Sequence, residues 1–140
     1  MKQEFSTKWI SSKQKRKQVK YRHNVPLHLR HRLMSANLSK ELRKKYAKRN
    51  FPLRKGDKVK VMRGKFSGKE GKVANVNLNR LRITIEGLQI QKKDGTKVNI
   101  YFNPSKVQIQ ELSLDDKERL NSMNRKQKNK ENKENASNKK

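Results

Sequence analysis

The sequence predicts a mainly β chain: a small barrel, a basic and partly helical N-terminal extension, and a short C-terminal helix with a tail. All six glycines lie between residues 56 and 95, where short apolar–polar alternations are separated by turn signals. Hydrophobic residues make up only 30% of the 140 residues, too few to bury the whole chain in one core. Lys and Arg number 39 against 12 Asp and Glu, a net charge of +27, which indicates a polyanionic partner.

Residues 1–25 form the predicted basic arm. Their hydrophobic periodicity is weak, so in free solution we expect a solvated, disordered arm. An arm that orders on RNA is the alternative, with Trp9 and Tyr21 stacked on bases or packed against a neighbour. A nuclear-import signal has a similar pattern. Over half of the net charge lies in residues 1–54.

Residues 26–54 are the predicted helical extension. Pro26 suits the first turn of a helix that ends near Ser35. Leu29 and Leu33 share one face of this helix, but Met34 falls nearly opposite, which fits either a helix wedged between two partners or a short irregular segment.

A second helix is expected over residues 40–47. Ser39 is a suitable N-cap for it. Leu42 and Tyr46 lie four residues apart on one face, which we expect to dock on the β domain. Pro52 then marks the boundary before that domain.

Residues 55–112 are the predicted β domain, with about six short strands. They are centred on residues 59–61, 73–76, 81–85, 88–90, 98–102 and 107–109. The spacing of Val73 and Val76 breaks strict alternation, which predicts a bulge near Asn75, and Asp94-Gly95 predicts a hairpin turn. In so short a segment, closure into a small barrel buries the apolar faces and removes exposed edges.

The loop between the first two of these strands contains three glycines. Gly64, Gly68 and Gly71 suggest either positive φ or close approach of another backbone. Four cations stand among them, namely Arg63, Lys65, Lys69 and Lys72. A tight cationic loop suits a phosphate backbone; the glycine spacing is not that of a Walker loop.

Residues 113–140 are the predicted C-terminal helix and tail. Ser113 and Asp116 resemble a capping box for a helix that runs to about Met123. The remainder is a low-complexity Lys/Glu/Asn tail, expected to be disordered or weakly helical.

The sequence offers no catalytic or metal-binding pattern. It has no cysteine, which removes disulfides and the usual zinc frameworks. His23, His28 and His31 lack a further ligand, because no carboxylate lies between Glu4 and Glu41. No apolar run approaches the ~18 residues of a membrane span. We therefore expect no enzyme, no metal, no cofactor, no small-molecule substrate and no membrane span.

The hairpin that opens the β domain resembles a KOW motif, with Lys55-Gly56-Asp57, the alternating Val59 and Val61, and the three glycines before Lys72-Val73. Longer stretches resemble the archaeal and eukaryotic ribosomal protein L-twenty-four family over roughly residues 12–120. These stretches are 25–30, 33–36, 38–43, 86–88, 92–96 and 103–107, together with Tyr46. Asn37 and the terminal tail depart from the family pattern.

This resemblance implies an SH3-like barrel in the large ribosomal subunit, in the cytoplasm. It implies that the chain binds the 5′ region of the large rRNA, contacts neighbouring large-subunit proteins, assists early assembly and lies near the polypeptide exit tunnel. A KOW-containing transcription elongation factor of the NusG type is the alternative, but it would need a second, mixed α/β domain. A basic membrane-surface protein is a third reading, for which a clean amphipathic helix is missing.

The predicted RNA-binding residues are cations of the arm, the hairpin loop and the third strand. The arm is expected to thread between rRNA helices, while the barrel meets phosphates from its surface. They are Lys13, Lys15, Arg16, Lys17, Lys20, Arg22, Arg30, Arg32, Arg63, Lys65, Lys69, Lys72, Arg80 and Arg82.

Overall fold

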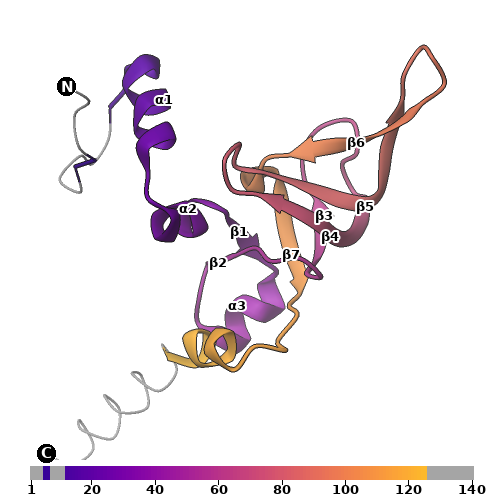
Figure 1. Cartoon of the computed structure of the whole chain (residues 1–140). Coiled ribbons are helices and arrows are strands. Elements are labelled where there is room, and N and C mark those ends of the chain that lie inside the picture. The colour runs from indigo at the N-terminus through magenta and orange to yellow at the C-terminus, as the bar shows by residue number, and fades with distance from the viewer. Residues whose placement is uncertain (1–4, 7–11, 126–140) are drawn as a thin grey trace, which may run out of the picture.

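The structure is a computed structural model that describes residues 5–6 and 12–125 (Figure 1). The expectations for Trp9 and for the tail beyond residue 125 lie outside these residues. The helices are α1 (Lys15–Asn24), α2 (Leu27–Leu33), α3 (Lys40–Tyr46), the 3-10 turn η1 (Pro104–Lys106) and a last helix described over residues 117–125. The strands are β1 (Ser35–Leu38), β2 (Asn50–Pro52), β3 (Lys58–Val61), β4 (Glu70–Asn77), β5 (Arg82–Gln91), β6 (Lys97–Phe102) and β7 (Val107–Glu111).

One seven-stranded sheet organises the chain, in the order β2-β1-β7-β3-β4-β5-β6. Every described pairing is antiparallel except that of β1 with β7, which is parallel. In Figure 1, α1 and α2 lie to one side of the sheet, and the β5–β6 hairpin projects at the other. The prediction of a mainly β chain with a partly helical extension and a C-terminal helix is confirmed, and the open seven-stranded sheet is consistent with the predicted small barrel.

The core lies inside the curled sheet. Val59, Val73, Ile83 and Ile109 are fully buried there, because they occupy the inward positions of their strands. Met123 of the last helix is also fully buried and belongs to the same cluster. The C-terminal helix therefore closes the core.

Two strands, β1 and β2, were not predicted. The sequence placed residues 35–38 between two helices, yet Ala36 and Leu38 are buried on one face with the period of a strand. The strand pairs with β2 and with Gln108 and Ile109 of β7, about 70 residues away, so the pattern within residues 35–38 does not reveal it. Pro52 consequently lies in β2 instead of marking a boundary. The division of the chain at residues 25, 54 and 112 stays a prediction.

The remaining strands follow the predicted segments, with one difference. The register shift between Val73 and Asn75 confirms the bulge, and Gly95 with φ 84° confirms the hairpin turn. The segments at 81–85 and 88–90 were predicted as separate strands. They form the single strand β5, whose register breaks between Thr84 and Gln89, because Gly87 takes φ 75° within it.

The glycines of the β3–β4 loop serve two different purposes. Gly64 and Gly68 have φ of 101° and 85°, so they supply the left-handed turns. Gly71 has no positive φ; a Cβ there would lie 2.7 Å from Ile85 Cγ2 and 2.9 Å from the Glu86 carbonyl oxygen. Of the two predicted reasons for a glycine, close approach applies at Gly71.

The two predicted helices of the extension are found close to their predicted positions, as α2 and α3. Ser39 caps α3 by accepting a hydrogen bond from the Leu42 N–H at 3.3 Å, and Tyr46 is buried as expected. Leu33 is 43% exposed, whereas Met34, just after the helix, is buried, because the chain turns there into β1 and carries Met34 into the core.

The helix α1 was not predicted. It contains no buried residue and no carboxylate. At its N-terminal end the Gln18 side chain donates to the Ser12 carbonyl at 2.5 Å. Tyr21 packs against Phe5, with ring centroids 5.2 Å apart. The helix α1 therefore adds no residue to the hydrophobic core.

The C-terminal helix is capped by Asp116, which accepts from the Glu118 N–H at 2.9 Å. The predicted cap, Ser113, instead donates its hydroxyl to Asp115. The prediction misplaced the cap by about one turn, because both positions carry a capping residue.

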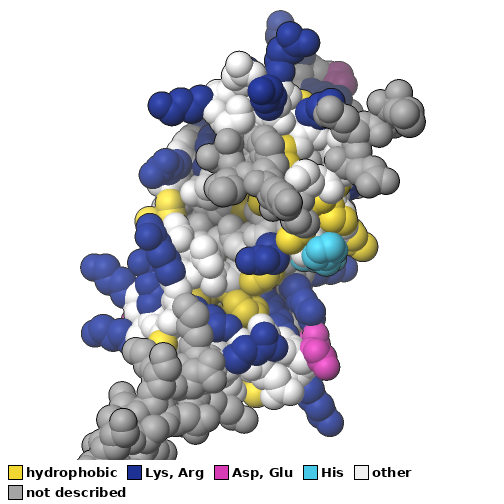
Figure 2. Space-filling model, turned by 90° about the vertical axis from the view of Figure 1, so that its left-hand side faces the viewer, with side chains coloured by type: hydrophobic (Ala, Val, Ile, Leu, Met, Phe, Trp, Pro, Cys, Tyr) yellow, Lys and Arg dark blue, Asp and Glu magenta, His cyan; other side chains and the backbone are white. Residues whose placement is uncertain are grey.

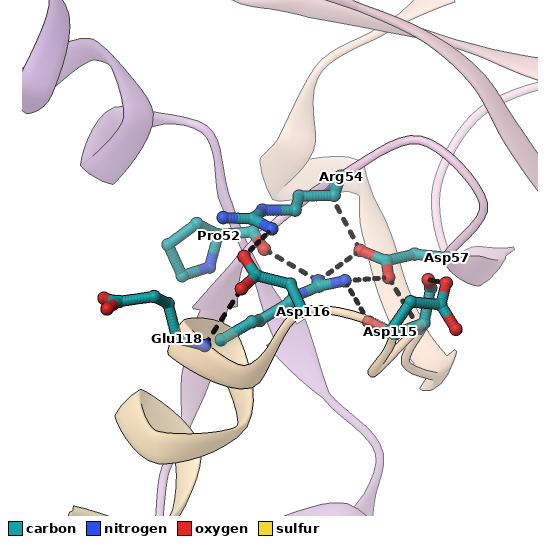
Figure 3. Close-up of polar contacts among 8 residues, drawn as sticks. Pro52, Arg54, Asp57, Asp115, Asp116 and Glu118 are labelled. Atoms are coloured by element: carbon teal, nitrogen blue, oxygen red, sulfur yellow. Dashed lines mark hydrogen bonds and ion pairs between the residues drawn. The ribbon is translucent and has the colours of Figure 1, made fainter.

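A buried ion pair fastens this helix to the β core (Figure 3). Asp57 is fully buried, and its carboxylate accepts hydrogen bonds from both Nη atoms of Arg119, at 2.8 and 2.7 Å. Its carboxylate also accepts the backbone N–H groups of Arg54 and Ser113, at 2.8 and 3.1 Å. Arg119 in turn donates to the carbonyl oxygens of Ser113 and Pro52. The aspartate of the KOW-like stretch is thus a structural anchor, and it is not available to a ligand.

Candidate nucleic-acid interface

The predicted RNA-binding cations lie on four parts of the structure. The arm cations lie at or in α1, Arg30 and Arg32 lie in α2, the glycine-loop cations lie between and on β3 and β4, and Arg80 and Arg82 lie at the β4–β5 turn. All are exposed except Arg30, which is half-buried. The structure therefore presents this predicted set, apart from Arg30, to solvent.

None of these cations is neutralised by a carboxylate of the described residues. The ion pairs there are Arg54–Asp116, Lys58–Glu111 (3.0 Å), Lys60–Glu70 (3.3 Å) and Arg119–Asp57 (2.7 Å). The carboxylate of Glu111 also raises the pKa of Lys58, through their hydrogen bond. The four carboxylates in these pairs thus partner cations outside the predicted set.

Positive charge is concentrated on α1. Lys15, Arg16, Lys17, Lys20 and Arg22 lie within ten residues, and like charges three or four apart on a helix repel. On the face of the molecule that includes α1 and α2, Lys and Arg are spread widely and carboxylates are few (Figure 2). A polyanion that binds a face of this kind releases its counterions.

Arg30 holds the arm against the β core. Its guanidinium donates to the carbonyl oxygens of Val25 and His23, both at 2.8 Å, and to Asn79 Oδ1 at 2.6 Å. Because Arg30 bonds carbonyl oxygens at the end of α1 and also Asn79 in the β4–β5 turn, it fixes the direction of α1 relative to that turn. No local pattern in the sequence indicates this positioning role.

The β3–β4 loop presents its cations on a defined frame. The Gly68 N–H donates to the Val61 carbonyl at 2.8 Å, and the Val61 N–H donates to the Lys69 carbonyl at 2.9 Å. Lys69 Nζ lies 5.5 Å from the centroid of the Phe66 ring. These contacts position the loop, while Arg63 and Lys65 extend into solvent.

The structure brings the β4–β5 turn next to the arm. Arg80 and Arg82 line the same groove as Arg22, although about 60 residues separate them. Between the two arginines stands Leu81, which has φ 51°, a conformation unfavourable for a bulky side chain. Sequence reasoning treated these arginines separately and did not foresee that they meet.

Metal-binding and membrane-spanning features are also absent from the described residues. Within ranges 5–6 and 12–125, no three His, Cys, Asp or Glu side chains gather in a way that could hold a metal. No helix in the same ranges has the length and apolar character to cross a membrane.

Comparison with known proteins identifies the family. The family model that describes eukaryotic ribosomal protein L26 and its archaeal counterpart L24 matches residues 12–126. The matched residues include part of the arm and the whole helical extension as well as the barrel. If the chain shared only a barrel with transcription factors of the NusG type, the match would not extend to the arm and the helical extension.

Similar proteins named "Large ribosomal subunit protein uL24" occur in three organisms. The one from Methanosphaera stadtmanae is 45% identical over 82% of this chain and 98% of its own length. The one from Korarchaeum cryptofilum is 46% identical over 84% and 89%. The one from Methanothrix thermoacetophila is 54% identical over 77% and 93%. The chain therefore belongs to the family of ribosomal proteins called L26 in eukaryotes and L24 in archaea, and it is a structural protein, not an enzyme.

Proposed function

We propose that the chain is a structural component of the large ribosomal subunit in the cytoplasm, and that it binds the large rRNA at its 5′ region. The observation that carries this proposal is the set of exposed cations without carboxylate partners, among the described residues, on α1, α2 and the β3–β4 loop. Membership of a ribosomal protein family supports rRNA as the polyanion. A role in early assembly, a place near the exit tunnel and contacts with neighbouring large-subunit proteins complete the proposal, on the strength of the family resemblance.

The mechanism is shape recognition by a rigid platform with a cationic arm. The buried core and the Asp57–Arg119 pair keep the barrel fixed, so the loop cations need little ordering when they meet phosphates. The arm helix lacks buried residues and gains its stability from the RNA that it neutralises. Contacts to phosphate and sugar, with few to base edges, are the mode expected for folded RNA.

Salt dependence of rRNA binding tests this mechanism. The full chain is titrated into a transcript of the 5′ region of the large rRNA at several salt concentrations. About six to ten phosphate contacts would lower the affinity roughly 10³- to 10⁵-fold between about 50 and 200 mM salt. An affinity that stays constant over this range would refute phosphate-dominated binding.

Variants separate the arm from the loop. Lys17→Gln with Lys20→Gln removes two exposed α1 cations, and the matched control Lys92→Gln with Lys93→Gln removes two from the β5–β6 hairpin tip, which is outside the proposed interface. The slope of log affinity against log salt should fall by about two units for the first pair and remain unchanged for the second. Sedimentation of tagged protein with the large subunit, and not with polymerase or lipid, tests the cellular assignment.

A further inference from the structure

A small groove lies between α1, the end of α2 and the β4–β5 turn. Its volume is about 380 Å³, near the lower end of the range of about 300–1,000 Å³ typical of small-ligand sites. This volume suits one extruded nucleotide and is too small for an RNA double helix. The residues that matter here are Val19, Arg22, Leu33, Arg80, Leu81 and Arg82.

The polar side of the groove is built for an anion. Arg22, Arg80 and Arg82 reach it from distant parts of the chain. Among the described residues no carboxylate lines it, and none of the three arginines forms an ion pair. Guanidinium groups bind phosphate oxygens in pairs and stack on bases. Their convergence is held in place because Arg30 ties the end of α1 to Asn79 in the turn.

The apolar side of the groove exposes hydrophobic surface that the described residues leave partly uncovered. Val19 is 57% exposed and Leu33 is 43% exposed. Leu81 packs partly on the core and holds a left-handed backbone, with φ 51°. Strain of this kind is retained where the surrounding structure enforces a geometry. An apolar surface beside three arginines matches the two halves of a nucleotide.

We propose that this groove binds one unpaired nucleotide of RNA. The arginines grip its phosphate, and its base lies against Val19, Leu33 and Leu81. The proposal rests on the proposed function, since it assumes that the chain binds RNA, and it adds a site that requires a base outside a duplex. Single-stranded positions are where proteins read RNA bases, because bases there can leave the stack.

Two uncharged substitutions test the base contact. The full-length double variant Val19→Ser with Leu33→Ser is titrated with an oligouridylate of about ten nucleotides and with an RNA duplex of about 20 base pairs, by fluorescence anisotropy. We expect roughly five- to tenfold weaker oligouridylate binding, an unchanged salt slope and unchanged duplex binding. Ile90→Ser with Val98→Ser removes a matched exposed apolar pair from the β5–β6 hairpin (48% and 39% exposed) and should leave both affinities unchanged.

The outcomes separate the two proposals. If the wild-type chain binds neither RNA in a salt-dependent way, the proposed function fails. If it binds both, but the groove variant binds oligouridylate as the wild type does, the groove proposal alone is wrong. The groove proposal would also be wrong if the wild-type chain bound a polyglutamate peptide as tightly as it binds oligouridylate. Photo-crosslinking of a 4-thiouridine oligonucleotide to wild-type protein is independent of any variant: we expect crosslinks in residues 19–33 or 79–82, and crosslinks confined to residues 62–69 would contradict the assignment.

Discussion

Replacing Arg119 with alanine removes the side chain that fastens the C-terminal helix to the β core. The guanidinium is almost fully buried, at 3% side-chain exposure, and makes two hydrogen bonds to a fully buried Asp57. The variant leaves that carboxylate in the core with only the backbone N–H groups of Arg54 and Ser113 as partners. Breaking a buried pair by removing one partner costs about 3–5 kcal/mol.

The cost should appear in thermal and urea unfolding followed by circular dichroism. For a chain of this size, about 3–5 kcal/mol corresponds to a fall in Tm of roughly 10–20 °C. The matched control is Arg54→Ala, whose pair with Asp116 is exposed (54% and 36%). An exposed pair contributes about 0–1 kcal/mol, so this variant should unfold close to the wild type.

A comparison of the two variants decides the matter. If Arg119→Ala unfolds within about 1 kcal/mol of Arg54→Ala, the buried pair does not anchor the helix and the reasoning is refuted. The double variant Asp57→Leu with Arg119→Met adds a second check. Since it removes both charges and keeps apolar volume, it should be more stable than Arg119→Ala, but it should stay below the wild type because the Arg54 and Ser113 N–H groups lose their acceptor.

Three further predictions follow from the same contacts. Gly71→Ala should lower the free energy of unfolding by about 1–3 kcal/mol, because its Cβ would meet Ile85 and the Glu86 backbone below 3 Å; wild-type stability in urea would contradict this. The hydrogen bond from Arg54 lowers the pKa of Asp116 below its usual 3.8. The contribution of this bond to the stability of the fold is therefore present above pH 3.8 and is lost as the pH falls through the lowered pKa. An NMR titration should show a higher Asp116 pKa in Arg54→Ala, and equal values would refute the assignment. The charged side chains of α1 are all cationic, so added salt should screen their repulsion and increase the helix content of residues 15–24, measured by NMR secondary chemical shifts. A helix content that falls with salt would argue against repulsion there.

Much of the barrel and the interface could be predicted from local patterns. The alternation at Val59, Val61 and Ile83 fixes which side chains face the core, since a strand exposes its two faces in turn. Asp94-Gly95 and the positive-φ positions Gly64 and Gly68 set the turns for reasons of local sterics. The cations of the arm and the loop are exposed because burying an unpaired charge is too costly. For these features the sequence alone was sufficient.

Other features depended on contacts between residues far apart in the chain. The strand β1 exists because β2 and β7 pair with its two edges, and Gly71 is required because β5 passes too close for a side chain. Asp57 and Arg119 are 62 residues apart, and Arg22 meets Arg80 and Arg82 only when α1 docks beside the β4–β5 turn. The sequence by itself determined the fold class and the cationic character, because these follow from side-chain chemistry and local backbone preference. The tertiary structure alone decided the anchor, the extra strands and the groove, because each needs a partner that only folding brings within reach.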